Sequence, residues 1–148
     1  MAVIKQLSIF VENKPGRMAR VAKILSEAGI NIRALTIAEA GDFGVIRMIV
    51  NDPLKGYKVL NSAGFTVSET DVLAIEMKDQ PGSLYVVVDA LGKNNVNIDY
   101  AYAFVTEKAK RAMLIMRVGE RVGDIDRATK VLKGAKVKLA TKEDLEMV

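Results

Sequence analysis

Cysteine and histidine are both missing from the 148 residues of this chain. Without cysteine, the chain can form no disulfide, no thiolate metal site and no cysteine nucleophile. Without histidine, it lacks the side chain that most often acts as a general base and as a transition-metal ligand. We therefore expect a protein that is not an enzyme, with no catalytic residue, no metal site and no cofactor.

Aromatic residues and strong net charge are also scarce. Four tyrosines and four phenylalanines are too dispersed to form a base-stacking strand, and 22 basic against 18 acidic residues give a net charge of only +4. The densest basic stretch, residues 108–111, is better explained as a solvated turn than as a nucleic-acid patch. No apolar run approaches the roughly 20 residues of a membrane span, and the N-terminus lacks the order of a signal peptide. These absences predict a cytoplasmic protein that binds neither nucleic acid nor membranes.

One sequence pattern occurs twice. The segment Asn13-Lys14-Pro15-Gly16, an apolar-periodic stretch and Gly29-Ile30-Asn31-Ile32 return 66 residues later as residues 79–82 and 95–98, with no gap between the two parts. Residues 6–35 and 72–101 are identical at eight positions. This period is too long for a solenoid repeat and suits a small domain. We predict two domains, residues 1–70 and 71–148, which should pack together because a domain of about 70 residues is marginal alone.

The apolar patterns within each copy predict the order strand, helix, strand, strand, helix, strand. In the first copy these elements are residues 3–11, 17–28, 30–40, 45–50, 53–63 and 65–69. In the second copy the strands are 72–77, 96–105, 112–118 and 135–140, the first helix is 83–94, and Val122 begins the apolar face of the second helix. Residues 141–148 are expected to form a charged, frayed tail. The order is that of the ferredoxin-like α+β sandwich, an antiparallel sheet with two helices on one face.

The segment Leu84–Val88 is ambiguous, because its branched residues favour a strand. Alignment with the better helical pattern of the first copy predicts a helix instead. Leu84, Val87 and Leu91 would then face inward, while Tyr85, Val86 and Val88 would face outward. We expect this outer apolar face to be covered by the other repeat or by another subunit.

The repeated motif resembles that of ACT domains, which are small ligand-sensing modules of amino-acid biosynthetic enzymes and of stand-alone regulatory proteins. The resemblance rests on x-Pro-Gly after a strand, a helix, and Gly-x-Asn-Ile at the next strand, and it covers both copies. The second copy departs from the motif twice, with Asp79 in place of Asn13 and Asn95 in place of Gly29. Since no catalytic domain accompanies the repeats, the chain resembles the stand-alone tandem class, with the effector at an interface between two ACT units.

This resemblance implies two half-sites, formed by Asn13, Gly16 and Asn31 and by Asp79, Gly82 and Asn97. Physically, a Pro-Gly turn leaves backbone N–H groups free at a helix start, which favours a carboxylate. A serine-responsive subgroup has a histidine where this chain has Val11, which argues against serine as the effector. The same polar residues also make ordinary turn hydrogen bonds in proteins without ligands, so both interpretations stay open.

Three functional hypotheses follow. The first is a non-catalytic sensor that binds an amino acid or similar small carboxylate and regulates a metabolic enzyme, and we expect it to form a homo-oligomer. The alternative is a structural or interaction module whose ligand site has been lost. The third is an enzyme of the acylphosphatase type, which needs an Arg–Asn pair in a phosphate-cradling loop. Arg17 and Asn13 are near each other in sequence, but the glycine-rich cradle is missing.

Overall fold

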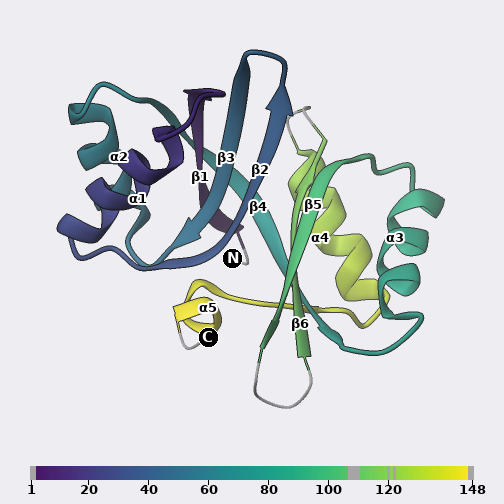
Figure 1. Ribbon diagram of the computed structural model, residues 1–148. Coiled ribbons are helices and arrows are strands. Elements are labelled where there is room, and N and C mark those ends of the chain that lie inside the picture. Colours follow the sequence, from purple (N-terminus) through teal and green to yellow (C-terminus); the bar gives the residue numbers. More distant parts are fainter. Residues whose placement is uncertain (1–2, 107–110, 120, 122, 147–148) are drawn as a thin grey trace. The chain divides into compact units, whose positions relative to one another are not determined.

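The computed structural model describes residues 3–106, 111–119, 121 and 123–146 (Figure 1). The chain divides into two compact units, one of residues 5–70 and one of residues 71–148 together with Val3 and Ile4. Most of residues 108–111, which the sequence predicts as a solvated turn, lie outside the described residues, as does Val122. Among the described residues, no helix combines the length and the apolar character needed to cross a membrane.

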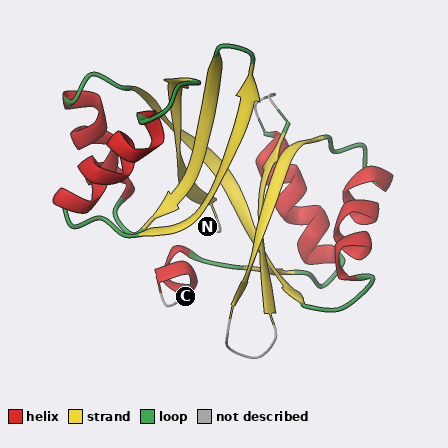
Figure 2. Cartoon of the chain, viewed as in Figure 1, coloured by secondary structure: helices red, strands yellow, loops and turns green. Residues whose placement is uncertain are grey.

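The first unit has the predicted order of elements. It contains β1 (Val3–Glu12), α1 (Arg17–Glu27), β2 (Ile32–Ala40), β3 (Phe43–Val50), α2 (Pro53–Ser62) and the first residues of β4 (Thr66–Lys78). The strands lie in the order β2-β3-β1-β4, and β3 is antiparallel to both of its neighbours. Both helices cover the same face of this sheet (Figure 2).

Alternation along the strands places the core of the first unit between its sheet and its helices. In the pairing of β1 with β3, Leu7 lies opposite Met48 and Ile9 lies opposite Ile46. These four side chains are buried against Val21, Leu25 and Leu60 from the two helices. Each fully buried side chain of this size contributes about 1.5–3 kcal/mol.

The second unit repeats the fold. It contains the remainder of β4, α3 (Ser83–Lys93), β5 (Ile98–Thr106), β6 (Arg111–Val118), α4 (Asp124–Gly134) and β7 (Lys138–Leu139). β4 pairs with β6 and β7, β6 pairs with β5, and all three pairings are antiparallel. β4, β5, β6 and β7 therefore take the places of β1, β2, β3 and the start of β4 in the first unit. The predicted tandem of ferredoxin-like units is confirmed.

The ambiguous segment of the second copy is helical, as the repeat alignment predicts. Val87 and Leu91 are buried, whereas Tyr85 and Val86 are 66% and 53% exposed. The prediction for Leu84 is wrong, since its side chain is 51% exposed. Helical periodicity gives Leu84 an inward angle, yet only Met18, at the matched position of α1, packs against the core of its unit. Val88 is partly buried instead of fully outward.

The C-terminal segment also differs from its prediction. The last strand has only two residues, and residues 142–146 of the expected frayed tail form a short helix, α5 (Lys142–Glu146). Thr141 and Asp144 cap this helix reciprocally, because each side chain accepts a hydrogen bond from the backbone N–H of the other, at 3.2 Å and 2.9 Å. Leu145 is buried, which holds the helix in place.

Candidate functional site

Both Pro-Gly loops end at the start of a helix in the same conformation. Gly16 precedes α1 with φ of 88°, and Gly82 precedes α3 with φ of 91°. Glycine adopts this left-handed conformation without a steric cost. No side chain caps either helix, and a Cβ atom on either glycine would meet nothing within 4 Å. Each loop therefore presents an accessible helix start that can accept an anion.

The first loop is bonded through Asn13 to the turn between β2 and β3. Its backbone N–H donates to the carbonyl of Asp42 at 2.8 Å, and its Nδ2 donates to the carbonyl of Gly41 at 3.3 Å. Next to it, the Glu12 carboxylate contacts Lys14 at 2.8 Å and Arg17 at 3.4 Å. The hydrogen bond and charge of Lys14, with the charge of Arg17, lower the pKa of Glu12. Asn13 thus ties the loop to the turn between β2 and β3.

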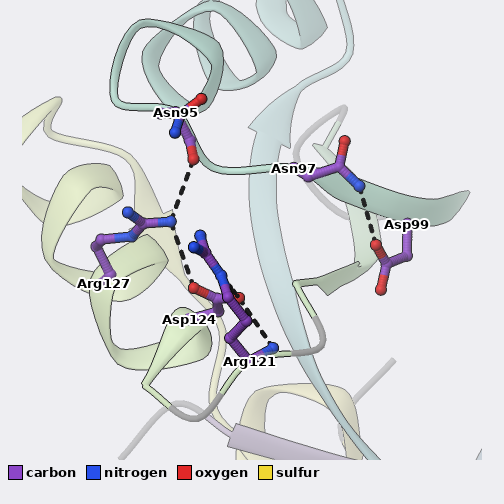
Figure 3. Close-up of polar contacts among 6 residues, drawn as sticks. All are labelled: Asn95, Asn97, Asp99, Arg121, Asp124 and Arg127. Carbon is purple, nitrogen blue, oxygen red and sulfur yellow. Dashed lines mark hydrogen bonds and ion pairs between the residues drawn. The ribbon is translucent and has the colours of Figure 1, made fainter.

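The two strand-entrance asparagines also make structural hydrogen bonds. The backbone N–H of Asn31 donates to Oδ1 of Asn51 at 3.0 Å, and the N–H of Asn51 donates back to the carbonyl of Asn31 at 3.1 Å. In the second unit, Nδ2 of Asn97 donates to Oδ1 of Asp99 at 3.0 Å (Figure 3). All six predicted site residues are exposed.

Within one unit, the predicted site residues lie at opposite ends of the sheet. Asn13 is bonded to the turn that begins β3, whereas Asn31 is bonded to Asn51, directly after β3 ends. A strand of eight residues spans about 24 Å, so no amino acid could contact both asparagines of one unit. The same separation holds in the second unit, because Lys78 pairs with Arg111 at one end of β6 while Asn97 accepts from Gly119 beyond the other.

An ion-pair network that the sequence did not reveal holds the Asn97 end of the second unit (Figure 3). Arg127 donates to the carbonyl of Asn95 at 3.1 Å and to the Asp124 carboxylate at 3.3 Å. The backbone N–H and the Nε of Arg121 also donate to Asp124, which is only 7% exposed. Burial acts to raise the pKa of Asp124, but these hydrogen bonds and the two arginine charges lower it overall.

The geometry explains why Asn95 can replace Gly29 of the first copy. Gly29 has φ of 72° and Asn95 has φ of 57°, so both positions need the left-handed conformation. Asparagine is among the non-glycine residues that adopt it most readily. This departure from the motif therefore preserves the turn that leads into Asn97.

The two ferredoxin-like units, each with a Pro-Gly loop before an uncapped helix, define a tandem of two homologous small domains. The sequence model of a family described as an ACT domain pair matches residues 1–148. The chain belongs to this family, and no curated protein matches it.

Solved structures agree with this assignment. Protein BT0572 from Bacteroides thetaiotaomicron is 41% identical, with a TM-score of 0.90 over 99% of this chain and 98% of that one. The ligand-free regulatory subunit of aspartate kinase from Thermus thermophilus is 14% identical, with a TM-score of 0.61 over 89% of each chain. Aspartate kinase from Clostridium acetobutylicum is 18% identical, with a TM-score of 0.55 over 90% of this chain and 33% of that enzyme. The last two similarities show a shared fold.

Proposed function

We propose that the protein is a non-catalytic regulatory sensor that binds an amino acid or a similar small carboxylate at an interface between ACT units. The observation that carries this proposal is the repeated geometry of the Pro-Gly loops. In both copies a left-handed glycine leaves a helix start open and without a side-chain cap. Such a start offers backbone N–H groups and a partial positive charge to a carboxylate.

A complete site requires residues from two units. The loop residues and the strand-entrance asparagine of one unit lie about 24 Å apart, as the length of β3 requires. We therefore infer that the carboxylate contacts the loop at Gly16 or Gly82 of one unit, while Asn31 or Asn97 of another unit contacts the polar end of the ligand. In the second copy, Asp79 can only accept hydrogen bonds when ionised and would favour the ammonium group.

The regulated partner in this proposal is a metabolic enzyme. Support comes by analogy from two solved proteins of the same fold, a regulatory subunit of aspartate kinase and an aspartate kinase described as allosteric. A structural module without a ligand is the second candidate. The hydrogen bonds of Asn13 to Gly41 and of Asn97 to Asp99 favour it, because they give these side chains a structural role without a ligand.

Thermal unfolding in the presence of each amino acid tests the proposal. A ligand at about 100 times its Kd should add roughly 2.7 kcal/mol to the free energy of unfolding. We expect at least one amino acid to stabilise the wild type, and its affinity, measured by calorimetric titration, to fall in Asn31→Ala or Asn97→Ala. Asn61→Ala, at an exposed position on α2, is the matched control and should bind normally.

Two outcomes would count against the proposal, and only the first would favour the module without a ligand. If no amino acid raises the unfolding temperature, the sensor proposal is wrong. If a ligand binds but both variants keep wild-type affinity, the asparagines are structural and the site lies elsewhere.

A further inference from the structure

The second unit contains a cavity that none of the predicted site residues line. Its volume is about 310 Å³, near the lower limit for small-molecule sites. It lies where the end of β4 meets the first turns of α3 and the segment leading into β7. Its wall combines an apolar part with charged groups, and the side chains that matter below are Glu76, Lys78, Val86, Arg111, Lys136 and Lys138.

The cavity carries a surplus of positive charge. Four cationic side chains and one carboxylate line it. The carboxylate belongs to Glu76, and it already contacts Lys138 at 2.7 Å and Arg111 at 3.7 Å. Lys78 and Lys136 form no ion pair with any other residue that the structure describes. Outside the cavity wall, Asp144 adds a further attraction on Lys138. Like charges gathered around one hollow repel each other, so an anion bound between them would be stabilised.

The backbone at Lys136 is also unusual. This residue has φ of 60° in the turn between α4 and β7, where its N–H donates to the carbonyl of Lys133. The same turn in the first copy contains Gly64, with φ of 91° and an equivalent bond to Asn61. A lysine in the left-handed conformation costs folding free energy that a glycine avoids. The second copy therefore has a lysine in a strained backbone conformation at the position where the first copy has a glycine, which adopts it without strain.

The first copy provides a built-in comparison, because it has none of these cations. By strand register, Lys78 and Arg111 match Glu12 and Phe43 of the first copy. The equivalent turns match Lys136 to Gly64 and Lys138 to Thr66. Arg20 and Phe65 of the first copy match Val86 and Val137 of the second. The Arg20 guanidinium lies 5.8 Å from the centre of the Phe65 ring. The first copy carries its cations at other positions, with Arg17 and Arg20 where the second copy has Ser83 and Val86, so the grouping of these four cations occurs in the second copy and not in the first.

We propose that this cavity is a second ligand site, which binds a small organic dianion, either a dicarboxylate or a phosphate monoester. Lys78 and Lys136 bind the anionic groups. Arg111 and Lys138, which both contact Glu76, add positive charge to the same cavity. The apolar wall, which includes Met77, Val86 and Val137, contacts the carbon skeleton of the ligand. Charge-assisted hydrogen bonds from lysine suit both kinds of anion. The cavity adjoins the Gly82 loop, because Ser83, the first residue of α3, also lines it, but it includes neither Asn31 nor Asn97 of the amino-acid site proposed above.

Calorimetric titration of the full-length protein with succinate, glycerol 3-phosphate and inorganic phosphate tests this site. We expect one equivalent of succinate or glycerol 3-phosphate to bind per chain, with an affinity that falls as salt rises, and inorganic phosphate to bind more weakly because it lacks a carbon skeleton. Lys136→Gly should weaken binding about tenfold, the effect of one charge-assisted hydrogen bond, and should raise the unfolding temperature of the free protein. Lys78→Gln should weaken binding by a similar factor.

The matched control is Lys130→Gln, which removes one charge from an exposed position of α4 outside the cavity wall. It should leave affinity within about twofold of the wild type. The proposal is wrong if neither organic anion binds at about 10 mM, or if Lys130→Gln weakens binding as much as Lys136→Gly. Since the amino-acid site is tested separately through Asn31 and Asn97, a failure of either proposal leaves the other standing.

Discussion

At the scale of single residues, Gly119 lies directly against the side chain of Asp124. Gly119 has φ of 55°, and a Cβ atom at this position would collide with the Asp124 carboxylate. That carboxylate is held by Arg121 and Arg127 in an arrangement that fixes the turn before α4 (Figure 3). Neither residue belongs to the repeated motif, so the motif alone gave no indication of this contact.

Gly119→Ala should therefore destabilise the protein by about 2 kcal/mol or more, because it adds both a collision and an unfavourable backbone conformation. Chemical denaturation measures this change. Gly134→Ala is the matched control, since this glycine ends α4 with open space around it. The control should be neutral or stabilising by up to about 1 kcal/mol. Equal effects of the two changes would contradict the assigned contact.

The charge of Asp124 should appear in the pH dependence of stability. Because the folded state lowers the pKa of this group, its contribution is fully present above about pH 4 and is lost as the pH falls through the lowered pKa. Asp124→Asn should be less stable than the wild type at pH 7, and the difference should shrink toward pH 3. Asp126→Asn, an exposed change in the same helical turn, is the control. A constant difference between wild type and Asp124→Asn from pH 7 to pH 3 would contradict the linkage.

At the scale of elements, the two copies begin their second helices differently. In the first unit, Asp52 caps α2, with its carboxylate accepting from the N–H of Lys55 at 3.2 Å and Pro53 at the first helical position. In the second unit, α4 begins after Gly123, which provides no side-chain cap. Asp124 in the first turn carries the favourable negative charge instead.

Asp52→Ala should cost about 1 kcal/mol of stability through loss of the cap. Asp52→Asn keeps an acceptor for the same N–H and should recover most of that loss. Thermal or chemical unfolding of the two variants and the wild type gives the comparison. If Asp52→Asn is as damaging as Asp52→Ala, the negative charge matters here and the hydrogen bond does not.

At the scale of the whole molecule, the exposed apolar residues of α3 have a consequence for assembly. Tyr85 and Val86 are both more than half exposed, and Leu84 adjoins them on the first turn. Clustered exposed apolar side chains on a protein surface commonly mark an interaction site. The expectation from the sequence, that the other repeat or another subunit covers this face, stays a prediction.

Tyr85→Lys should consequently weaken self-association, because it places a charge in a face that we expect to be buried between subunits. Sedimentation equilibrium of the variant and the wild type over a range of concentrations measures the shift. Leu54→Lys, at an apolar position of α2 that is 57% exposed, is the control and should leave association unchanged. A wild type that stays monomeric at every concentration would remove α3 as a subunit interface.

The sequence by itself determined the tandem organisation, the order of elements and the family. Turn glycines and apolar periodicity act between neighbours in the chain, so they predicted α2 and the Pro-Gly turns. The ungapped repeat decided the helical state of Leu84–Val88, where local propensity favoured a strand.

Only the tertiary structure decided which residues lie together. It separated Asn13 from Asn31 by the length of a strand, although one motif contains both. It also gathered Lys78, Arg111 and Lys136 around one cavity from three distant segments. Periodicity specifies the direction of a side chain but not which side chains surround it, since Leu84 is exposed while Met18, at the matched position of the first copy, packs against the core. Contacts between distant segments depend on the register and length of paired strands, and a local pattern carries no information about either.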